Sequence, residues 1–327
     1  MRVLVTGASG FIGGFLVQRL VEQGHEVICL LRKTSARDHL PLEQIRLHIG
    51  SLHDVDSLSL ALEQVEVVFH LAGAVRAVRR SEFYTINAKG TENLLLACDR
   101  AAGGTLKRFV LVSSLAAAGP CIEGRPLTEA DPPRPVSDYG RSKLEAEKIA
   151  WQYANRFPVT VLRPPIVYGP RDRDVYQYFR QVRAGVALKL GRRERLFSLI
   201  HVQDLVRGIE MAATAPNASG NTYFLCNPEP ASWDRLGNLI ARSLNAHPVH
   251  FVVPECMVYP IAAISEAAAR IRRKPALLNF DKIREMKESC WVCSPEKAGQ
   301  DFGFRTEYTL ETGIKQTAEW YIEHGWL

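Results

Sequence analysis

A glycine-rich turn between an apolar run and an amphipathic segment is the feature that most constrains the fold of this chain. Residues 2–5, RVLV, form a short, mostly apolar run that is too short for a helix and suits a buried strand. Residues 6–13 follow as TGASGFIG, and apolar residues then recur at helical spacing. This order predicts a dinucleotide-binding βαβ unit. Gly7 would permit the tight turn, Gly10 would let the backbone approach a pyrophosphate, and Gly13 would let the helix pack against the strand.

Further strands and helices alternate along the first two thirds of the chain. The expected strands cover residues 26–31, 45–49, 65–71, 109–114, 158–163 and, as a return to the same sheet, 221–225. Long helices are expected over 83–102 and 137–155. Such alternation predicts an α/β fold with a Rossmann-like, doubly wound parallel sheet. We expect residues 1–168 to bind the dinucleotide, with returns near 200–226, and 169–327 to form a smaller, mostly substrate-binding region.

Composition excludes several classes of protein. The 327 residues are 46% apolar and 23% charged, and a net charge of +6 is too mild to argue for nucleic acid. No apolar run reaches the roughly 20 residues of a membrane span. The nearest, 257–269, contains Glu266. The apolar helix expected near 257–271 could border an apolar substrate or belong to the core, and we favour the core. Seven irregularly spaced cysteines indicate no disulfide framework and favour a reducing cytoplasm. The CxxC at 290–293 is expected to hold ordinary thiols and no metal.

The pair Tyr139 and Lys143 carries the clearest signal for catalysis. Four residues apart, they share one face of the expected helix. A phenol near pKa 10 is a poor acid–base catalyst, and a neighbouring ammonium would lower its pKa. Ser114, at the end of an expected strand, could orient a substrate oxygen. His70 could act as a base, but a histidine at a buried strand end is more commonly part of the core.

The end of the second expected strand bears on the choice of cofactor. An acid there grips the ribose 2′-hydroxyl of NAD, whereas an arginine accommodates the 2′-phosphate of NADP. This chain has Arg32 at that place and no acid. We therefore expect NADP, with NAD as the other possibility.

With these motifs the chain resembles the extended short-chain dehydrogenase/reductase family, the NAD-dependent epimerase/dehydratase group. The matching segments are TGASGFIG at 6–13, HLAG at 70–73, NAKGT at 87–91, SS at 113–114, YGRSK at 139–143, LRPPIVYGP at 162–170 and IHVQD at 200–204. The resemblance implies Ser114, Tyr139 and Lys143 as catalytic residues. It implies a cofactor site formed by Gly7, Gly10, Phe11, Ile12, Gly13, Arg32, Asp54, Leu71, Ala72, Gly73, Asn87, Tyr139, Lys143, Pro164 and Val167. It also implies a homodimer formed through the helices near 83–102 and 139–155.

Departures from the family pattern narrow the range of reactions that the resemblance implies. Leu115 and Ala116 stand where 4,6-dehydratases carry an acidic pair, and Ile166 stands where UDP-hexose 4-epimerases have an asparagine. Ser51 replaces an aspartate common in the adenine loop. The chain thus resembles the ketoreductase branch, which implies an NAD(P)-dependent oxidoreductase that interconverts a secondary alcohol and a ketone. A nucleotide-sugar 4-epimerase with tightly bound NAD and a non-catalytic cofactor sensor stay open. The basic run at 191–195 could hold an anionic group but is typical of a solvated turn.

Overall fold

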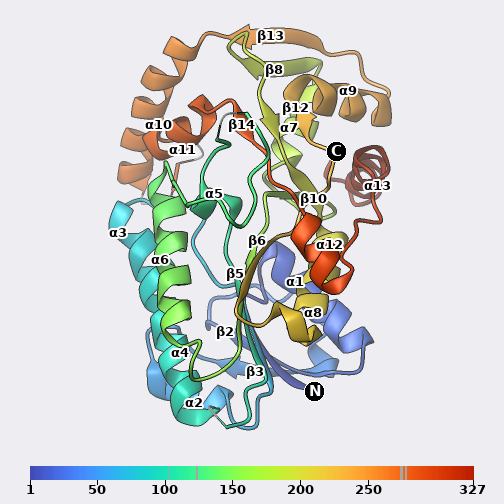
Figure 1. Ribbon diagram of the computed structural model, residues 1–327. Coiled ribbons are helices and arrows are strands. Elements are labelled where there is room, and N and C mark those ends of the chain that lie inside the picture. The colour runs from blue at the N-terminus through green and yellow to red at the C-terminus, as the bar shows by residue number, and fades with distance from the viewer. Residues whose placement is uncertain (103, 123, 273–274, 277) are drawn as a thin grey trace.

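The computed structural model describes residues 1–102, 104–122, 124–272, 275–276 and 278–327. Its centre is a parallel sheet of seven strands in the order β11-β6-β5-β4-β1-β2-β3 (Figure 1). The strands are β1 (Arg2–Thr6), β2 (Glu26–Leu31), β3 (Ile45–Ile49), β4 (Val67–His70), β5 (Arg108–Val112), β6 (Val159–Arg163) and β11 (Asn221–Phe224). Their near-continuous apolar runs fit a sheet that is covered on both faces. The Rossmann-like α/β fold predicted from the sequence is confirmed.

Helices cover both faces of this sheet. On one face, α1 (Phe11–Glu22) and α8 (Val202–Thr214) pack together over residues such as Val3 and Val5. The other face is covered by α2 (Val55–Ala61), α4 (Gly90–Ala101) and α6 (Asp138–Gln152). Figure 1 shows α4 and α6 side by side along one flank and α1 with α8 along the other. This arrangement leaves the strand ends free to form a site.

A second group of elements lies at one end of the sheet. Its core joins α7 (Tyr176–Arg183), α9 (Trp233–Ser243) and α13 (Leu310–Glu323). Three small sheets accompany it, with the orders β10-β7, β12-β9-β14 and β13-β8. Their strands are β7 (Ile166–Tyr168), β8 (Val186–Leu190), β9 (Leu196–Phe197), β10 (Leu199–His201), β12 (Ala231–Ser232), β13 (Val249–Val253) and β14 (Cys290–Trp291). The remaining helices are α5 (Leu115–Ala118), α10 (Val258–Arg272), α11 (Phe280–Lys287) and α12 (Glu296–Phe302).

Two expected elements differ in detail from the prediction. The helix expected over 83–102 is divided into α3 (Arg80–Phe83), a π-helical segment (Tyr84–Lys89) and α4. Such π segments are common at functional sites, and this one contains Asn87. The apolar stretch 257–269 does not form a core helix, because only Val258 and Ala262 of α10 are buried. No helix within the described ranges is long and apolar enough to cross a membrane.

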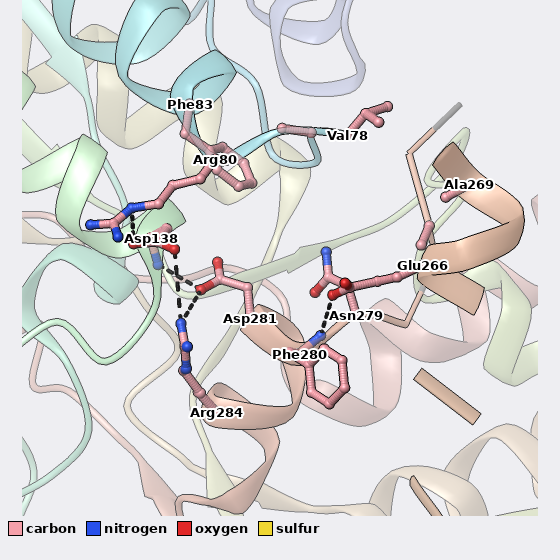
Figure 2. Close-up of a pocket in the computed structure, with 12 residues that line it drawn as sticks. Val78, Arg80, Phe83, Asp138, Glu266, Ala269, Asn279, Phe280, Asp281 and Arg284 are labelled. Carbon is pink, nitrogen blue, oxygen red and sulfur yellow. Dashed lines mark hydrogen bonds and ion pairs between the residues drawn. The ribbon is translucent and has the colours of Figure 1, made fainter. Parts of the chain in front are cut away.

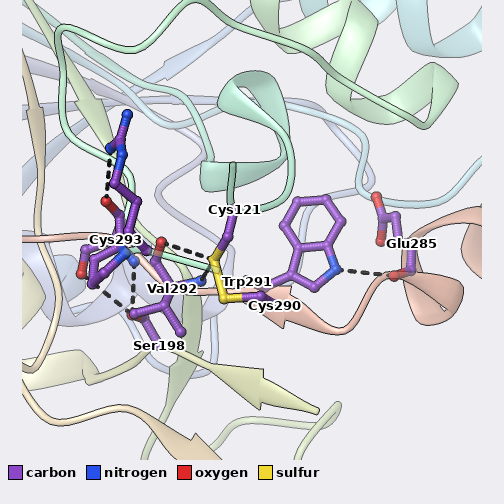
Figure 3. The surroundings of a disulfide bond; sticks show 9 residues. Cys121, Ser198, Glu285, Cys290, Trp291, Val292 and Cys293 are labelled. Atoms are coloured by element: carbon purple, nitrogen blue, oxygen red, sulfur yellow. Dashed lines mark hydrogen bonds between the residues drawn. A yellow bond between two sulfur atoms is a disulfide. The ribbon is translucent and has the colours of Figure 1, made fainter. Parts of the chain in front are cut away.

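The expectation of ordinary thiols at 290–293 is wrong for Cys290. This residue forms a disulfide with Cys121, which lies in the loop between α5 and α6, and the two Cα atoms are 5.2 Å apart (Figure 3). The backbone N–H of Cys121 donates to the carbonyl oxygen of Cys290 at 2.8 Å, so the two segments also pair through their main chains. Cys293 remains a buried thiol. The bond links residues 169 positions apart, a proximity that spacing cannot reveal.

Candidate active site

The glycine turn has the geometry that its sequence predicted. Gly7 has a φ of +74°, and a Cβ atom there would lie 2.7 Å from the backbone nitrogen of Ala72. A Cβ atom at Gly13 would lie 2.1 Å from the carbonyl oxygen of Gly7. Any larger residue at either position would force β1, α1 and the end of β4 apart. At Gly10, by contrast, a Cβ would meet only the Gly7 carbonyl oxygen, at 3.1 Å.

The N-terminus of α1 fits the phosphates of a dinucleotide. Gly10 caps the helix without a side-chain hydrogen bond, and the first turn contains no acidic residue. The first N–H groups of a helix have no partner within it, and the helix dipole favours an anion there. The turn thus has glycines in place of larger side chains and no carboxylate at the start of α1, as a site for a pyrophosphate requires. Phe11 and Ile12 lie in this first turn.

Ser114, Tyr139 and Lys143 meet at the carboxyl end of β5. Ser114 follows that strand as the N-cap of α5, and its hydroxyl lies close enough to the phenol of Tyr139 to affect the pKa of that phenol. Lys143 lies one turn further along α6, is buried, and donates from Nζ to the carbonyl oxygen of Val112 at 2.8 Å. A Cβ atom on Gly73, just beyond β4, would lie 3.5 Å from that Nζ. The three side chains predicted from the sequence therefore converge beside the predicted cofactor strand ends.

The electrostatics of the pair differ from the expectation that Lys143 would lower the pKa of Tyr139. Burial raises the pKa of Tyr139 to about 12, and the neighbouring Ser114 hydroxyl opposes this shift. Burial lowers the pKa of Lys143 to about 8, whereas the nearby Glu147 carboxylate raises it. The Lys143 ammonium donates to the Val112 carbonyl oxygen, and burial is the largest cause of the pKa shift in both Tyr139 and Lys143. At neutral pH the phenol is protonated and can donate.

A buried polar chain supports the site behind these residues. The Asn87 side chain accepts from the Ala74 N–H at 2.7 Å and donates to the Ser142 hydroxyl at 2.8 Å. His70 contacts the Thr6 hydroxyl through Nδ1 at 2.6 Å and the Thr91 hydroxyl through Nε2 at 2.9 Å. Burial lowers the pKa of His70 to about 3. The histidine is thus a satisfied core residue, as the sequence analysis favoured.

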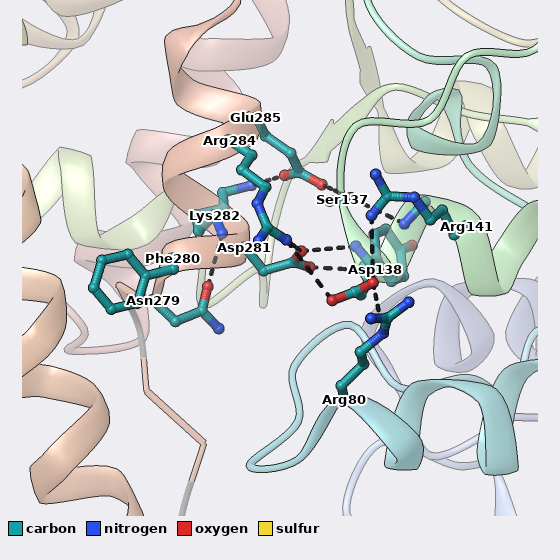
Figure 4. A network of polar contacts seen from close by, with 12 residues as sticks. Arg80, Ser137, Asp138, Arg141, Asn279, Phe280, Asp281, Lys282, Arg284 and Glu285 are labelled. Carbon is teal, nitrogen blue, oxygen red and sulfur yellow. Dashed lines mark hydrogen bonds and ion pairs between the residues drawn. The ribbon is translucent and has the colours of Figure 1, made fainter.

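Helix α11 supplies contacts to the catalytic helix that the sequence did not indicate. The Asp281 carboxylate accepts from the backbone N–H of Asp138 at 2.7 Å and of Tyr139 at 3.2 Å (Figure 4). Glu285 accepts from the Ser137 hydroxyl at 2.7 Å. Two carboxylates from a distant part of the chain therefore cap the first turn of α6, where they also complement the helix dipole. They fix the position of the Tyr139 backbone.

A buried ion pair anchors the middle of α6 to the sheet. Glu147 accepts from Arg163 at 2.9 Å and 2.6 Å in a two-pronged contact, and Ser113 donates to the same carboxylate at 2.5 Å. Both charged side chains are almost fully buried. Arg163 belongs to β6 and Ser113 follows β5, so the pair connects the helix that carries Tyr139 and Lys143 to two strands.

A cavity of about 230 Å³ lies beside the catalytic helix (Figure 2). Phe83 lines it and stands 6.0 Å, ring centre to ring centre, from Tyr139. Asp138 and Asp281 line the same side, while Glu266 and Ala269 of α10 face them across the cavity. The cavity therefore lies between the start of α6 and α10, and several of the side chains that line it are charged.

Most of the other predicted cofactor residues lie at strand ends or helix starts of the same sheet. Arg32 follows β2 and is exposed, and its backbone N–H donates to Ser35 at 3.1 Å. Asp54 caps α2 by accepting from the Ser57 N–H at 3.0 Å, so it has a structural role of its own. Leu71 and Ala72 follow β4 and Pro164 follows β6, whereas Val167 lies in β7 of the small β10-β7 sheet.

Comparisons with known proteins agree with this geometry. A model of the NAD dependent epimerase/dehydratase family matches residues 3–226, and the chain belongs to this family. It is 26% identical to a ceramide reductase of Caulobacter vibrioides, over 99% of this chain and 96% of that protein. It is 27% identical to a 2-alkyl-3-oxoalkanoate reductase of Shewanella oneidensis, over 95% and 84%.

A solved structure supports the fold. The UDP-glucuronic acid 4-epimerase of Bacillus cereus in complex with NAD superposes with a TM-score of 0.80 at 21% identity, over 99% of each chain. An epimerase also occurs among the curated relatives, since the chain is 25% identical to a UDP-glucose 4-epimerase of Vibrio cholerae over 98% of this chain and 95% of that protein. The family is NAD(P)-dependent.

Proposed function

We propose that this protein is an NADP-dependent reductase that interconverts a ketone and a secondary alcohol. The observation that carries the proposal is the convergence of the Ser114 and Tyr139 hydroxyls at the end of β5, with the buried Lys143 one turn away beside Gly73. A sensor of cofactor ratio would need no such proton-donating arrangement. NAD is the alternative cofactor.

The three side chains divide the work of the reaction. When bound, the nicotinamide supplies a hydride to the carbonyl carbon. Ser114 orients the carbonyl oxygen, and the protonated Tyr139 phenol gives it a proton. Lys143 then favours the resulting phenolate through its positive charge. The phenol, whose pKa burial raises to about 12, is protonated at neutral pH and so has a proton to donate.

The glycine turn and Arg32 form the proposed cofactor site. Gly7, Gly10 and Gly13 would admit the pyrophosphate at the start of α1, and the Arg32 guanidinium would pair with the 2′-phosphate. Arg32 is exposed directly after β2, where no acid competes for the ribose.

The substrate we propose is a ketone that carries alkyl chains. The names of the two relatives, a ceramide reductase and a 2-alkyl-3-oxoalkanoate reductase, support this class. Leu115 and Ala116 offer no acid for dehydration, and Ile166 offers no amide for a nucleotide diphosphate. A nucleotide-sugar 4-epimerase is the second candidate, favoured by the shared fold with the UDP-glucuronic acid 4-epimerase.

The rest of the proposal concerns organisation. We propose a homodimer formed through the 83–102 and 139–155 segments, a dinucleotide-binding region over 1–168 and a mostly substrate-binding region over 169–327. We also propose a cytoplasmic location. Disulfides are rare in a reducing compartment, so the Cys121–Cys290 bond counts against that location.

One experiment on purified protein separates the two reactions. The protein is denatured and its released nucleotide is quantified, and NADPH oxidation is then followed with 2-alkyl-3-oxo acids of increasing chain length. A reductase retains little nucleotide and consumes one NADPH per alcohol formed. Stoichiometric retained NAD, with no net consumption in the presence of any ketone, would support the epimerase and overturn the reductase.

A further inference from the structure

Helix α10 exposes an apolar face that nothing in the described chain covers. Ile264 and Ile271 are 72% and 84% exposed, and Ile261 is also exposed. These residues, with Pro260, Ala267 and Ala268, recur at three- and four-residue spacing and so form one stripe along the helix. The opposite face contributes only Val258 and Ala262 to a small buried cluster. The helix is thus apolar on the side that faces water.

This stripe belongs to a larger concentration of exposed apolar side chains. Nine of the nineteen large apolar side chains that are exposed among the described residues fall within 249–280. They come from β13, the short 3₁₀ helix Glu255–Met257, α10 and the start of α11, and they are Val249, Phe251, Val252, Met257, Tyr259, Ile261, Ile264, Ile271 and Phe280. Figure 1 shows β13 and α10 at the same end of the molecule. Clustering of this kind marks an interaction surface.

Basic residues border the stripe, and acidic ones are absent from it. Arg272 is exposed at the end of α10. Arg192 and Arg193, with Glu194, are exposed in a turn that is tied to the segment just before α10, because the buried Arg195 pairs with Glu255 at 2.6 Å. The one acid of α10, Glu266, faces the cavity beside the catalytic helix instead (Figure 2). The sequence expectation of a wholly solvated turn at 191–195 is therefore wrong for Arg195.

From this pattern we infer that α10 docks on the surface of an anionic lipid bilayer. An apolar stripe with cationic flanks is the pattern of a helix that lies in the membrane interface, where apolar side chains enter the acyl boundary and basic ones meet anionic headgroups. A second protein of mixed surface charge would not require an acid-free stripe bordered by arginines. The 15 residues of α10 suit this interfacial position.

The position of α10 also gives the docking a purpose, which rests on the proposed function. The helix turns Ile264 and Ile271 outward and Glu266 and Ala269 into the cavity. A ketone with alkyl chains that leaves the bilayer beside α10 would emerge next to this cavity, which borders the helix that carries Tyr139. The docking surface and the mouth of the substrate site would then share one helix.

Vesicle sedimentation tests the docking without any turnover. Full-length protein is mixed with sucrose-loaded vesicles of phosphatidylglycerol and phosphatidylethanolamine, or of phosphatidylcholine alone, and the bound fraction is measured. We expect binding to the anionic vesicles that weakens with salt. The Ile264→Ser/Ile271→Ser variant should bind at least about a hundredfold more weakly, from the loss of two buried isoleucines. Arg272→Glu should bind several-fold more weakly.

The matched control is Leu60→Ser, because Leu60 of α2 is 74% exposed but lies outside the 249–280 cluster. This variant should bind vesicles as the parent does. All variants should reduce a short, water-soluble ketone at the parent rate. If the parent ignores anionic vesicles, or if the double isoleucine variant binds them as well as the parent, the inference is overturned.

Analytical ultracentrifugation tests whether a second copy of this chain, rather than a membrane, covers the apolar face of α10. A parent dimer that the double isoleucine variant dissociates would show that a second copy covers α10, and this result would also overturn the inference. Because vesicle binding needs neither cofactor nor substrate, absence of reductase activity would refute the proposed function and leave the docking result intact.

Discussion

The buried pair of Glu147 and Arg163 makes a quantitative prediction about the helix that carries the candidate catalytic residues. Replacing Glu147 by Gln keeps the side-chain shape but leaves the Arg163 guanidinium buried without a counter-charge. Breaking a buried pair in this way costs about 3–5 kcal/mol. With about 2.1 cal/mol/K of unfolding entropy per residue over 327 residues, this corresponds to a fall in Tm of about 4–7 °C.

Differential scanning calorimetry and urea unfolding of the parent and Glu147→Gln measure this loss. The control is Glu145→Gln on the same helix, because Glu145 forms only an exposed contact with Lys148 at 3.6 Å and should change Tm by less than about 1 °C. The double variant Glu147→Leu/Arg163→Met should recover most of the loss, since no charge stays buried. A Glu147→Gln variant as stable as the parent would refute the reasoning.

The same substitution has a second, electrostatic consequence. The Glu147 carboxylate raises the pKa of Lys143, which burial otherwise lowers to about 8. Without that carboxylate the pKa of Lys143 should fall further. The alkaline limb of the pH–rate profile, where Lys143 loses its proton, should move to lower pH.

Three further predictions concern pH, cofactor and covalent structure. The free energy of unfolding should fall as the pH drops from about 6.5 toward 3, because His70 is protonated in the unfolded chain but stays neutral when buried, where its pKa is lowered to about 3. In urea titrations over this pH range, His70→Asn should lose less stability than the parent. Arg32→Asp should reverse the cofactor preference in thermal-shift and KM measurements, and an unchanged preference would exclude Arg32 from the 2′-phosphate site. Thiol titration of the denatured protein should find five thiols without reductant and seven after reduction, and seven thiols without reductant would contradict the disulfide. By the chain-entropy model, Cys121→Ser/Cys290→Ser should lower the free energy of unfolding by up to about 5 kcal/mol.

Local patterns explain why much of the fold and site could be predicted from sequence. The glycine turn depends only on the contacts between β1, α1 and the end of β4, and its three glycines mark in the sequence where the backbone must turn or pack closely. Tyr139 and Lys143 are one helical turn apart, so helix geometry alone places them on one face. Apolar runs between turns likewise predicted the parallel strands.

Contacts between distant segments explain what the sequence did not reveal. Asp281 caps α6 although it lies 142 residues after Tyr139 in the chain, and the spacing of the acidic residues in α11 does not indicate this contact. Helix α10 has the composition of a core helix, yet tertiary packing covers only its narrow Val258–Ala262 side. The pKa of Tyr139 depends on how deeply the assembled site buries it, which no local pattern encodes.

The central claim is that a bound dinucleotide faces a proton-donating phenol at Tyr139. Turnover and cofactor binding of Tyr139→Phe, measured on the same preparation, test it most directly. The account predicts at least about a hundredfold loss of kcat with an NADPH Kd close to that of the parent, because only the transferred proton is removed. Turnover within a few-fold of the parent, with NADPH still bound, would contradict it.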